Sequence, residues 1–91
     1  MTTILITFLV TTLSGTPIRG AWVGVEGMVT TNAETADRQL TDSRGRYMIE
    51  IEPGQIRKYQ VTHQDYQAVY DEVEMSLHGA VVRVELSKRE P

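Results

Sequence analysis

The sequence predicts an all-β protein, and three of its features carry this prediction. Apolar and polar residues alternate in several short segments, as in strands that bury one face. Threonine and valine are abundant, whereas runs of Ala, Leu, Glu and Lys that would favour helices are missing. Turn residues such as Gly, Pro, Ser and Asp separate the alternating segments at short intervals. Together these features favour a seven-stranded Greek-key β-sandwich.

The strands follow from the alternation in chain order. We expect them at residues 4–12, 21–26, 38–41, 46–52, 57–63, 66–77 and 80–86. The fourth has the clearest alternation, with Tyr47, Ile49 and Ile51 on one face. In the sixth, the apolar residues come into phase only if a bulge or bend interrupts the run. Residues 28–38 are expected to form a long loop between sheets, with a single helical turn capped by Asn32 as the alternative.

The segment Thr41-Asp42-Ser43-Arg44-Gly45-Arg46-Tyr47 is the strongest turn signal in the chain. Because alternating segments flank it, we expect it to connect the two strands of a β-hairpin. Asp42 can accept a hydrogen bond from the backbone two residues further on, and Gly45 can adopt the positive φ that such a turn requires. Tyr47 is expected to enter the core.

Length and composition bound the classes of function. The 91 residues suit one domain spanning positions 1–91, with a single modest core. The net charge is −3 and no basic cluster precedes Lys88-Arg89, so nucleic-acid binding through phosphates gains no support. The absence of cysteine excludes disulfides, thiolate metal sites and cysteine nucleophiles.

The apolar start of the chain is expected to be a strand rather than a signal peptide. Residues 1–10 carry no basic residue ahead of the apolar run, and threonines interrupt it. The run is also too short to span a bilayer, so no membrane-spanning segment is expected.

Four motifs, taken in order, resemble the carboxypeptidase regulatory-like domain. They are Gly15-Thr16-Pro17-Ile18-Arg19-Gly20-Ala21-Trp22-Val23; Thr41 to Tyr47; Pro53-Gly54; and Tyr59-Gln60-Val61 running to Tyr66. The resemblance implies a transthyretin-like (prealbumin-like) sandwich, related in arrangement to immunoglobulin domains. It also implies an accessory, linker or cell-adhesion module without peptidase activity. Such modules are mostly exported or at the surface; with no signal peptide here, a cytoplasmic or virion component is the other expectation.

No residue set predicts catalysis, a metal or a cofactor. The two histidines, His63 and His78, are fifteen residues apart without the spacing of metal ligands. The serines lack a nearby base in any nucleophile motif. The acidic residues of the sixth strand are those expected of a solvated strand face. We therefore expect a non-enzymatic protein; an enzyme would need His63 to meet a carboxylate in the fold.

The candidate interaction surface consists of Trp22, Leu5, Leu9 and Tyr70. Trp22 is out of phase with the apolar residues of its strand, so it is expected to face outward. The first strand is apolar on both faces, and Leu5 or Leu9 beside Trp22 would form an exposed apolar patch. The alternative is that the loop at 28–38 covers Trp22.

Two functions remain open. The first is a structural or protein-contact module, either docked to a neighbouring domain or forming a homodimer through a first strand at the sheet edge. The alternative is a carbohydrate-binding module that uses exposed aromatics, Trp22 together with Tyr70, because aromatic side chains can stack on sugars.

Overall fold

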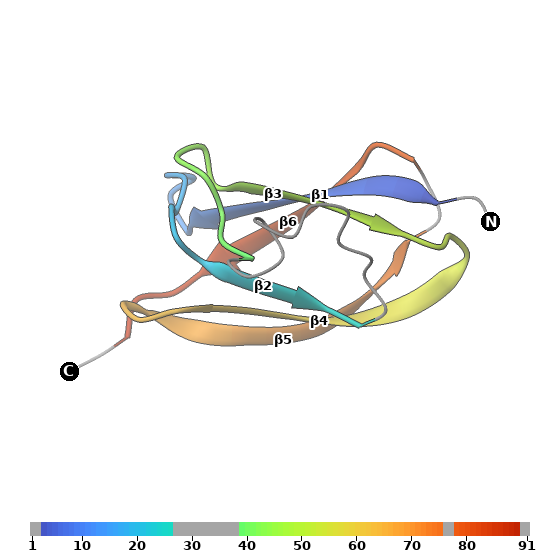
Figure 1. The fold of residues 1–91 in the computed structure, drawn as a ribbon. Coiled ribbons are helices and arrows are strands. Elements are labelled where there is room, and N and C mark those ends of the chain that lie inside the picture. The colour runs from blue at the N-terminus through green and yellow to red at the C-terminus, as the bar shows by residue number, and fades with distance from the viewer. Residues whose placement is uncertain (1–2, 27–38, 76–77, 90–91) are drawn as a thin grey trace.

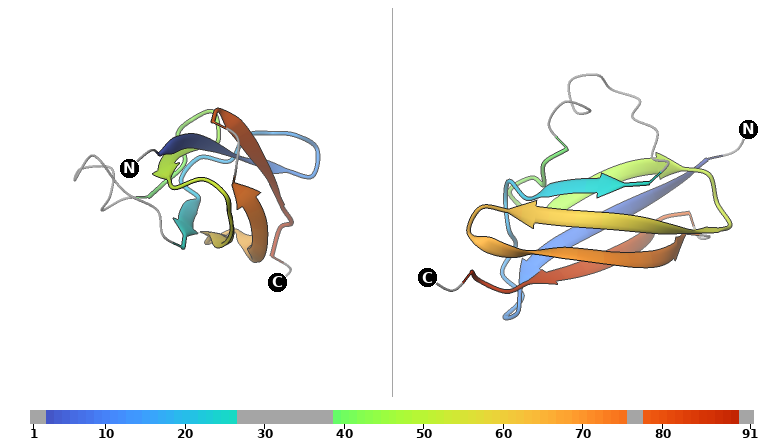
Figure 2. Two further views of the ribbon diagram at one scale, coloured as in Figure 1. Left: turned by 90° about the vertical axis from the view of Figure 1, so that its right-hand side faces the viewer. Right: turned by 90° about the horizontal axis from the view of Figure 1, so that it is seen from below.

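The computed structural model describes residues 3–26, 39–75 and 78–89, and these form an all-β fold. Its strands are β1 (Ile4–Thr12), β2 (Trp22–Val25), β3 (Arg46–Ile51), β4 (Gln55–His63), β5 (Tyr66–Met75) and β6 (Ala80–Leu86). They make two three-stranded sheets, ordered β3-β1-β6 and β2-β4-β5. In Figure 1 one sheet lies above the other, and the end-on view in Figure 2 shows the same two layers. None of the described segments is a helix long and apolar enough to cross a membrane.

Strand β1 is the centre of the first sheet. It pairs antiparallel with β3, placing Phe8 opposite Tyr47, and parallel with β6, placing Phe8 opposite Val82. The expectation of a first strand at a sheet edge is therefore wrong. Both sides of β1 already carry hydrogen-bonded partners, so a homodimer cannot form by pairing along this strand.

The second sheet is antiparallel, with β4 between β2 and β5. The register shifts between the pairs Val61–Val69 and His63–Tyr66, because β5 uses one more residue than β4 over this interval. The expected interruption of this strand is thus present near the start of β5, as an irregularity in its pairing with β4. It brings both Tyr66 and Val69 into contact with the core.

One apolar core fills the space between the sheets. Alternate residues of β1 are buried, and so are alternate residues of β3, which confirms the period-2 prediction for both strands. Phe8 of one sheet meets Tyr59 of the other edge to face, with ring centroids 5.3 Å apart. The buried apolar residues are Ile4, Ile6, Phe8, Val10, Ile18, Ala21, Val23, Val25, Tyr47, Ile49, Ile51, Tyr59, Val61, Val84 and Leu86.

The described residues contain six strands rather than seven. The strand expected at 38–41 is reduced to one bridge, between Leu40 and Trp22. Gln39 has a φ of 47°, which breaks the extended backbone. Its carbonyl accepts the Val23 N–H at 2.8 Å, and its side-chain amide donates to the Val23 carbonyl at 2.8 Å. Gln39 therefore hydrogen-bonds to the Val23 N–H and carbonyl at the edge of β2, although it is not part of a strand.

The turn at Asp42–Gly45 is not a hairpin. The segment before it lies against β2, whereas β3 after it pairs with β1 in the other sheet. We call Thr41–Tyr47 the corner, because the chain changes sheets there. Its local geometry is as predicted: Asp42 Oδ1 accepts the N–H of Arg44 at 2.8 Å, and Gly45 has a φ of 75°. The turn residues specified the bend, but they did not specify which strand pairs with the segment on either side of it.

The corner is fixed to the loop that precedes β2. The buried hydroxyl of Thr41 donates to the Ile18 carbonyl at 2.7 Å and accepts the Ala21 N–H at 2.9 Å. Gly45 is buried, and its carbonyl accepts the Val10 N–H at 2.7 Å. These bonds join two of the sequence motifs in space. The expected loop at 28–38 and its alternative helical turn at Asn32 lie outside the described residues.

Candidate functional site

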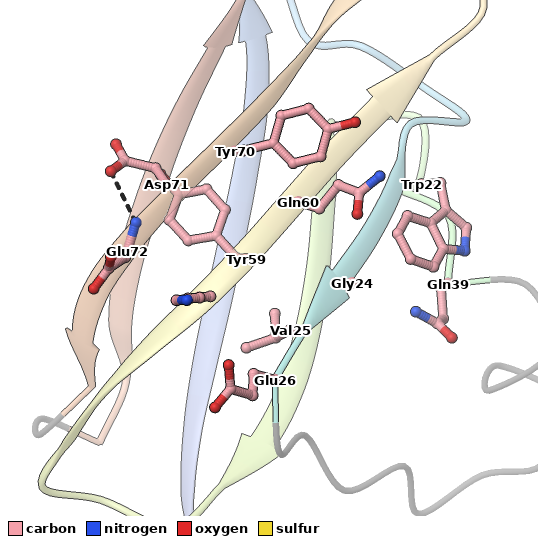
Figure 3. Close-up of a pocket in the computed structure, with 11 residues that line it drawn as sticks. Trp22, Gly24, Val25, Glu26, Gln39, Tyr59, Gln60, Tyr70, Asp71 and Glu72 are labelled. Atoms are coloured by element: carbon pink, nitrogen blue, oxygen red, sulfur yellow. Dashed lines mark hydrogen bonds between the residues drawn. The ribbon is translucent and has the colours of Figure 1, made fainter.

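An open groove of about 590 Å³ crosses the outer face of the β2-β4-β5 sheet (Figure 3). We call it the aromatic groove. The residues around it are Trp22, Gly24, Val25, Glu26, Gln39, Lys58, Tyr59, Gln60, Tyr70, Asp71 and Glu72. They come from all three strands of this sheet and from the segment beside β2. Two of the four predicted interaction residues, Trp22 and Tyr70, therefore meet at one site.

Trp22 faces outward because it alternates with the buried Val23 and Val25. Its indole lies along the strand over Gly24, where a Cβ would overlap the far end of the ring. The side chain is 37% exposed. The glycine thus leaves room for the indole to lie over the strand, with part of its surface open to solvent. The sequence analysis did not predict that Gly24 makes room for the indole. A glycine two residues after an outward-facing Trp in a strand could have indicated it.

Gln60 and Tyr70 continue the same face across the sheet. The register places Gln60 opposite Gly24 on one side and opposite Tyr70 on the other. Figure 3 shows Gln60 between Trp22 and Tyr70. Two strand spacings, about 10 Å, separate the Gly24 and Tyr70 positions. Tyr70 is 70% exposed, so the row carries an aromatic group at each end and an amide in the middle.

Acidic groups dominate the charge of the groove. Glu26, Asp71 and Glu72 line it against a single cation, Lys58. Asp71 Oδ1 accepts the N–H of Glu72 at 2.8 Å, the contact drawn in Figure 3. Burial, together with the negative charge of Asp71, raises the pKa of the Tyr59 phenol. The phenol is uncharged at neutral pH in any case, so the three carboxylates against one ammonium leave the groove with a net negative charge.

Leu5 and Leu9 do not belong to this site. They alternate with the buried residues of β1, so they lie on the outer face of the other sheet. Leu5 is 38% exposed and pairs in register with Glu50. The expected patch of Trp22 beside Leu5 or Leu9 is therefore wrong, because the whole core separates the two faces.

Each histidine contacts the main chain, His63 close by in the sequence and His78 at the distant strand β1. His63 Nδ1 accepts the N–H of Asp65 at 3.1 Å, and its ring meets Tyr66 edge to face at 5.2 Å. His78 Nδ1 accepts the N–H of Leu5 at 3.1 Å. Within residues 3–26, 39–75 and 78–89, no three His, Cys, Asp or Glu side chains converge as metal ligands would. In both histidines, therefore, Nδ1 accepts a hydrogen bond from a main-chain N–H.

Comparison of the sequence with protein-family models and with curated proteins finds no match.

Proposed function

We propose that the chain is a non-enzymatic recognition module with a transthyretin-like Greek-key sandwich, similar to carboxypeptidase regulatory-like domains. Two sheets around one core support this arrangement. The bonds from Thr41 to Ile18 and Ala21 support it further, because they join two of the motifs that carry the resemblance.

The function that the site supports best is binding of a saccharide in the aromatic groove. One observation carries it: Trp22 and Tyr70, far apart in the sequence, flank the same open groove with Gln60 between them. A flat, partly exposed indole offers a platform for the apolar C–H face of a sugar ring. The side-chain amide and the carboxylates offer donors and acceptors for its hydroxyl groups.

The spacing indicates an oligosaccharide rather than a single sugar. The aromatic groups stand at opposite ends of a row that crosses two strand spacings, about 10 Å. A single pyranose ring cannot cover both ends at once. The glycan would therefore lie across the strands, and the carboxylates of Glu26 and Glu72 would favour neutral or amino sugars over acidic ones.

Intrinsic fluorescence tests this function directly, because Trp22 is the only tryptophan in the chain. Neutral oligosaccharides that score on a glycan array should shift or quench its emission. Trp22→Ala and Tyr70→Ala should each weaken array binding about tenfold, since each removes a stacking platform. Met48→Ala, on the other sheet, is the matched control and should leave binding unchanged. Absence of any glycan signal, or equal loss in the control, would contradict the proposal.

Protein contact or structural support is the second candidate, carried by the outer face of the β3-β1-β6 sheet. Met48 and Val81 are 65% and 53% exposed, and both lie opposite Thr7 of the central strand. With Leu5 they give an apolar surface of the kind found at interfaces. Such a contact would use the face of β1 rather than its edge.

Light scattering tests this second candidate. If copies of the chain associate through the face, Val81→Glu should raise the dimer dissociation constant about tenfold, because it places a charge in the contact. Ile56→Glu on β4, also at a 64% exposed position, is the control. A strict monomer at all concentrations would exclude the homodimer and leave only a foreign partner.

A further inference from the structure

A second groove, of about 920 Å³, lies beside the corner. We call it the arginine groove. Its lining residues are Thr7, Arg19, Gly20, Leu40, Thr41, Asp42, Ser43, Arg44, Arg46, Tyr47 and Met48. It shares none of these with the aromatic groove. The corner and the loop before β2, which supply most of this lining, lie side by side at one end of the molecule in Figure 1.

Three arginines from two separate parts of the chain surround the groove. Arg19 belongs to the loop before β2, Arg44 to the corner and Arg46 to the first position of β3. All three side chains are exposed. The sequence alone did not suggest this cluster, because only the tertiary contact between loop and corner adds Arg19 to Arg44 and Arg46.

The backbone under these arginines is firmly held. The Thr41 hydroxyl ties the corner to the loop of Arg19, through the Ile18 carbonyl and the Ala21 N–H. The Arg46 carbonyl accepts the N–H of Asp42 at 3.0 Å. The backbone positions from which the three side chains project are therefore set before any ligand arrives, and this part of the chain pays no ordering cost on binding.

The acidic residue in the groove lining is already engaged. Asp42 Oδ1 accepts the N–H groups of Arg44 at 2.8 Å and Arg46 at 3.0 Å, so its carboxylate is held by the turn. Three guanidinium groups against one carboxylate leave the groove positively charged, although the chain as a whole carries −3. The aromatic groove has the opposite balance.

Apolar side chains accompany the arginines. Leu40 is 44% exposed and Met48 is 65% exposed, and both line the groove. Arginine and methionine are enriched where proteins bind one another, since a planar cation pairs with carboxylates while the thioether adapts to the partner's shape. A ligand that matches the groove therefore needs both acidic and apolar groups.

We propose that the arginine groove binds an acidic peptide segment of a partner protein, one that carries apolar side chains between its carboxylates. The guanidinium groups pair with the carboxylates, and Leu40 and Met48 receive the apolar side chains. This site is independent of the saccharide proposal: it lies on other residues and selects the opposite charge.

Selection from a random-peptide display library against the wild-type protein tests the proposal. The double variant Arg19→Ser/Arg44→Ser removes two charges at exposed positions. Arg83→Ser, on β6 and outside the groove lining, is the matched loss of an exposed arginine. Selected peptides should be rich in Asp, Glu and apolar residues. They should bind the double variant about tenfold more weakly and Arg83→Ser within about twofold of wild type.

Two further measurements keep the result decisive. Thermal unfolding of each variant should match wild type, which separates lost binding from lost folding. Amide chemical shifts should change at Arg19, Arg44 and Arg46 when a selected peptide is added. The proposal is overturned if no acidic sequence is enriched, or if selected peptides bind the double variant as well as wild type. It is also overturned if a sulfated oligosaccharide binds here and the peptides do not, since that identifies a general polyanion site.

Discussion

The corner and the aromatic groove differ in how their polar and aromatic groups are used. In the corner, the Thr41 hydroxyl makes two buried hydrogen bonds and Asp42 Oδ1 accepts two backbone N–H groups. In the groove, Trp22 and Tyr70 keep 37% and 70% of their surface open to solvent. Groups that satisfy one another inside the chain maintain the fold, whereas exposed aromatic groups leave binding energy available for a partner. Substitutions in the corner should therefore lower stability. Substitutions in the aromatic groove should instead weaken binding and leave stability almost unchanged.

The largest effect on stability is expected at Gly45. Alanine there combines an unfavourable positive φ with a Cβ that would overlap the Val10 carbonyl oxygen. Gly45→Ala should lower the free energy of unfolding by about 3 kcal/mol, measured by urea denaturation. Valine, which is β-branched, should be worse.

Gly20→Ala is the matched control for Gly45→Ala. Gly20 has nearly the same φ, 77° against 75°, but a Cβ there would meet nothing within 4 Å. Its cost should be only about 1 kcal/mol, the cost of the left-handed backbone alone. Equal losses at both glycines would show that the contact with Val10 does not matter.

Thr41→Val should have the next largest effect. The substitution keeps the shape of the side chain but leaves the Ile18 carbonyl and the Ala21 N–H without their partner in a buried site. The free energy of unfolding should fall by about 2 kcal/mol. Thr7→Val, on the outer face of β1, makes the same chemical change at a half-buried position and should be nearly neutral. A neutral Thr41→Val would mean that the corner is not held by this hydroxyl.

Asp42 should give the corner a modest dependence on pH. The backbone N–H groups of Arg46 and Arg44, helped by their guanidinium charges, lower its pKa below the usual 3.8. A carboxylate with a lowered folded-state pKa stabilises the protein above its unfolded-state pKa, and this contribution is lost as pH falls through the folded-state value. The urea midpoint of wild type should exceed that of Asp42→Ala at pH 7, and the gap should narrow below pH 3.8. A constant gap from pH 7 to pH 2 would contradict this role for the carboxylate.

Gly24→Ala should leave stability almost unchanged and still alter the aromatic groove. The added Cβ overlaps only the far end of the Trp22 ring, and this partly exposed side chain can swing away. The free energy of unfolding should stay within about 0.5 kcal/mol of wild type. The tryptophan emission maximum should shift, and saccharide binding should weaken as in Trp22→Ala. An unchanged emission spectrum would show that the indole does not lie over Gly24.

Much of the fold could be predicted because its signals are local. Alternation located β1, β3 and β6 to within a residue at each end, and it identified the core faces of β1 and β3. Turn chemistry identified the bend at Asp42 and the positive φ of Gly45. Each of these depends on residues within a few positions of one another, so a single sequence contains the information.

The pairing of segments could not be predicted in the same way. Nothing local to Leu40 distinguishes a partner in β2 from one in β3, so the corner was expected to be a hairpin. Nothing local to Leu5 shows that its strand is central, or that it lies across the core from Trp22. Strand order depends on contacts between distant segments, and these carry little trace in a single sequence.

By itself, the sequence determined the all-β class, most strand positions, the bend of the corner and the outward direction of Trp22. Only the tertiary structure decided which outward residues share a face. Leu5 and Leu9 lie on the other sheet from Trp22, whereas Tyr70 and Gln60 line the same groove as its indole. The tertiary structure also collected three arginines around a second groove. The physical reason is that alternation fixes the side of a sheet on which a residue lies, whereas a binding site requires knowing which strands are neighbours.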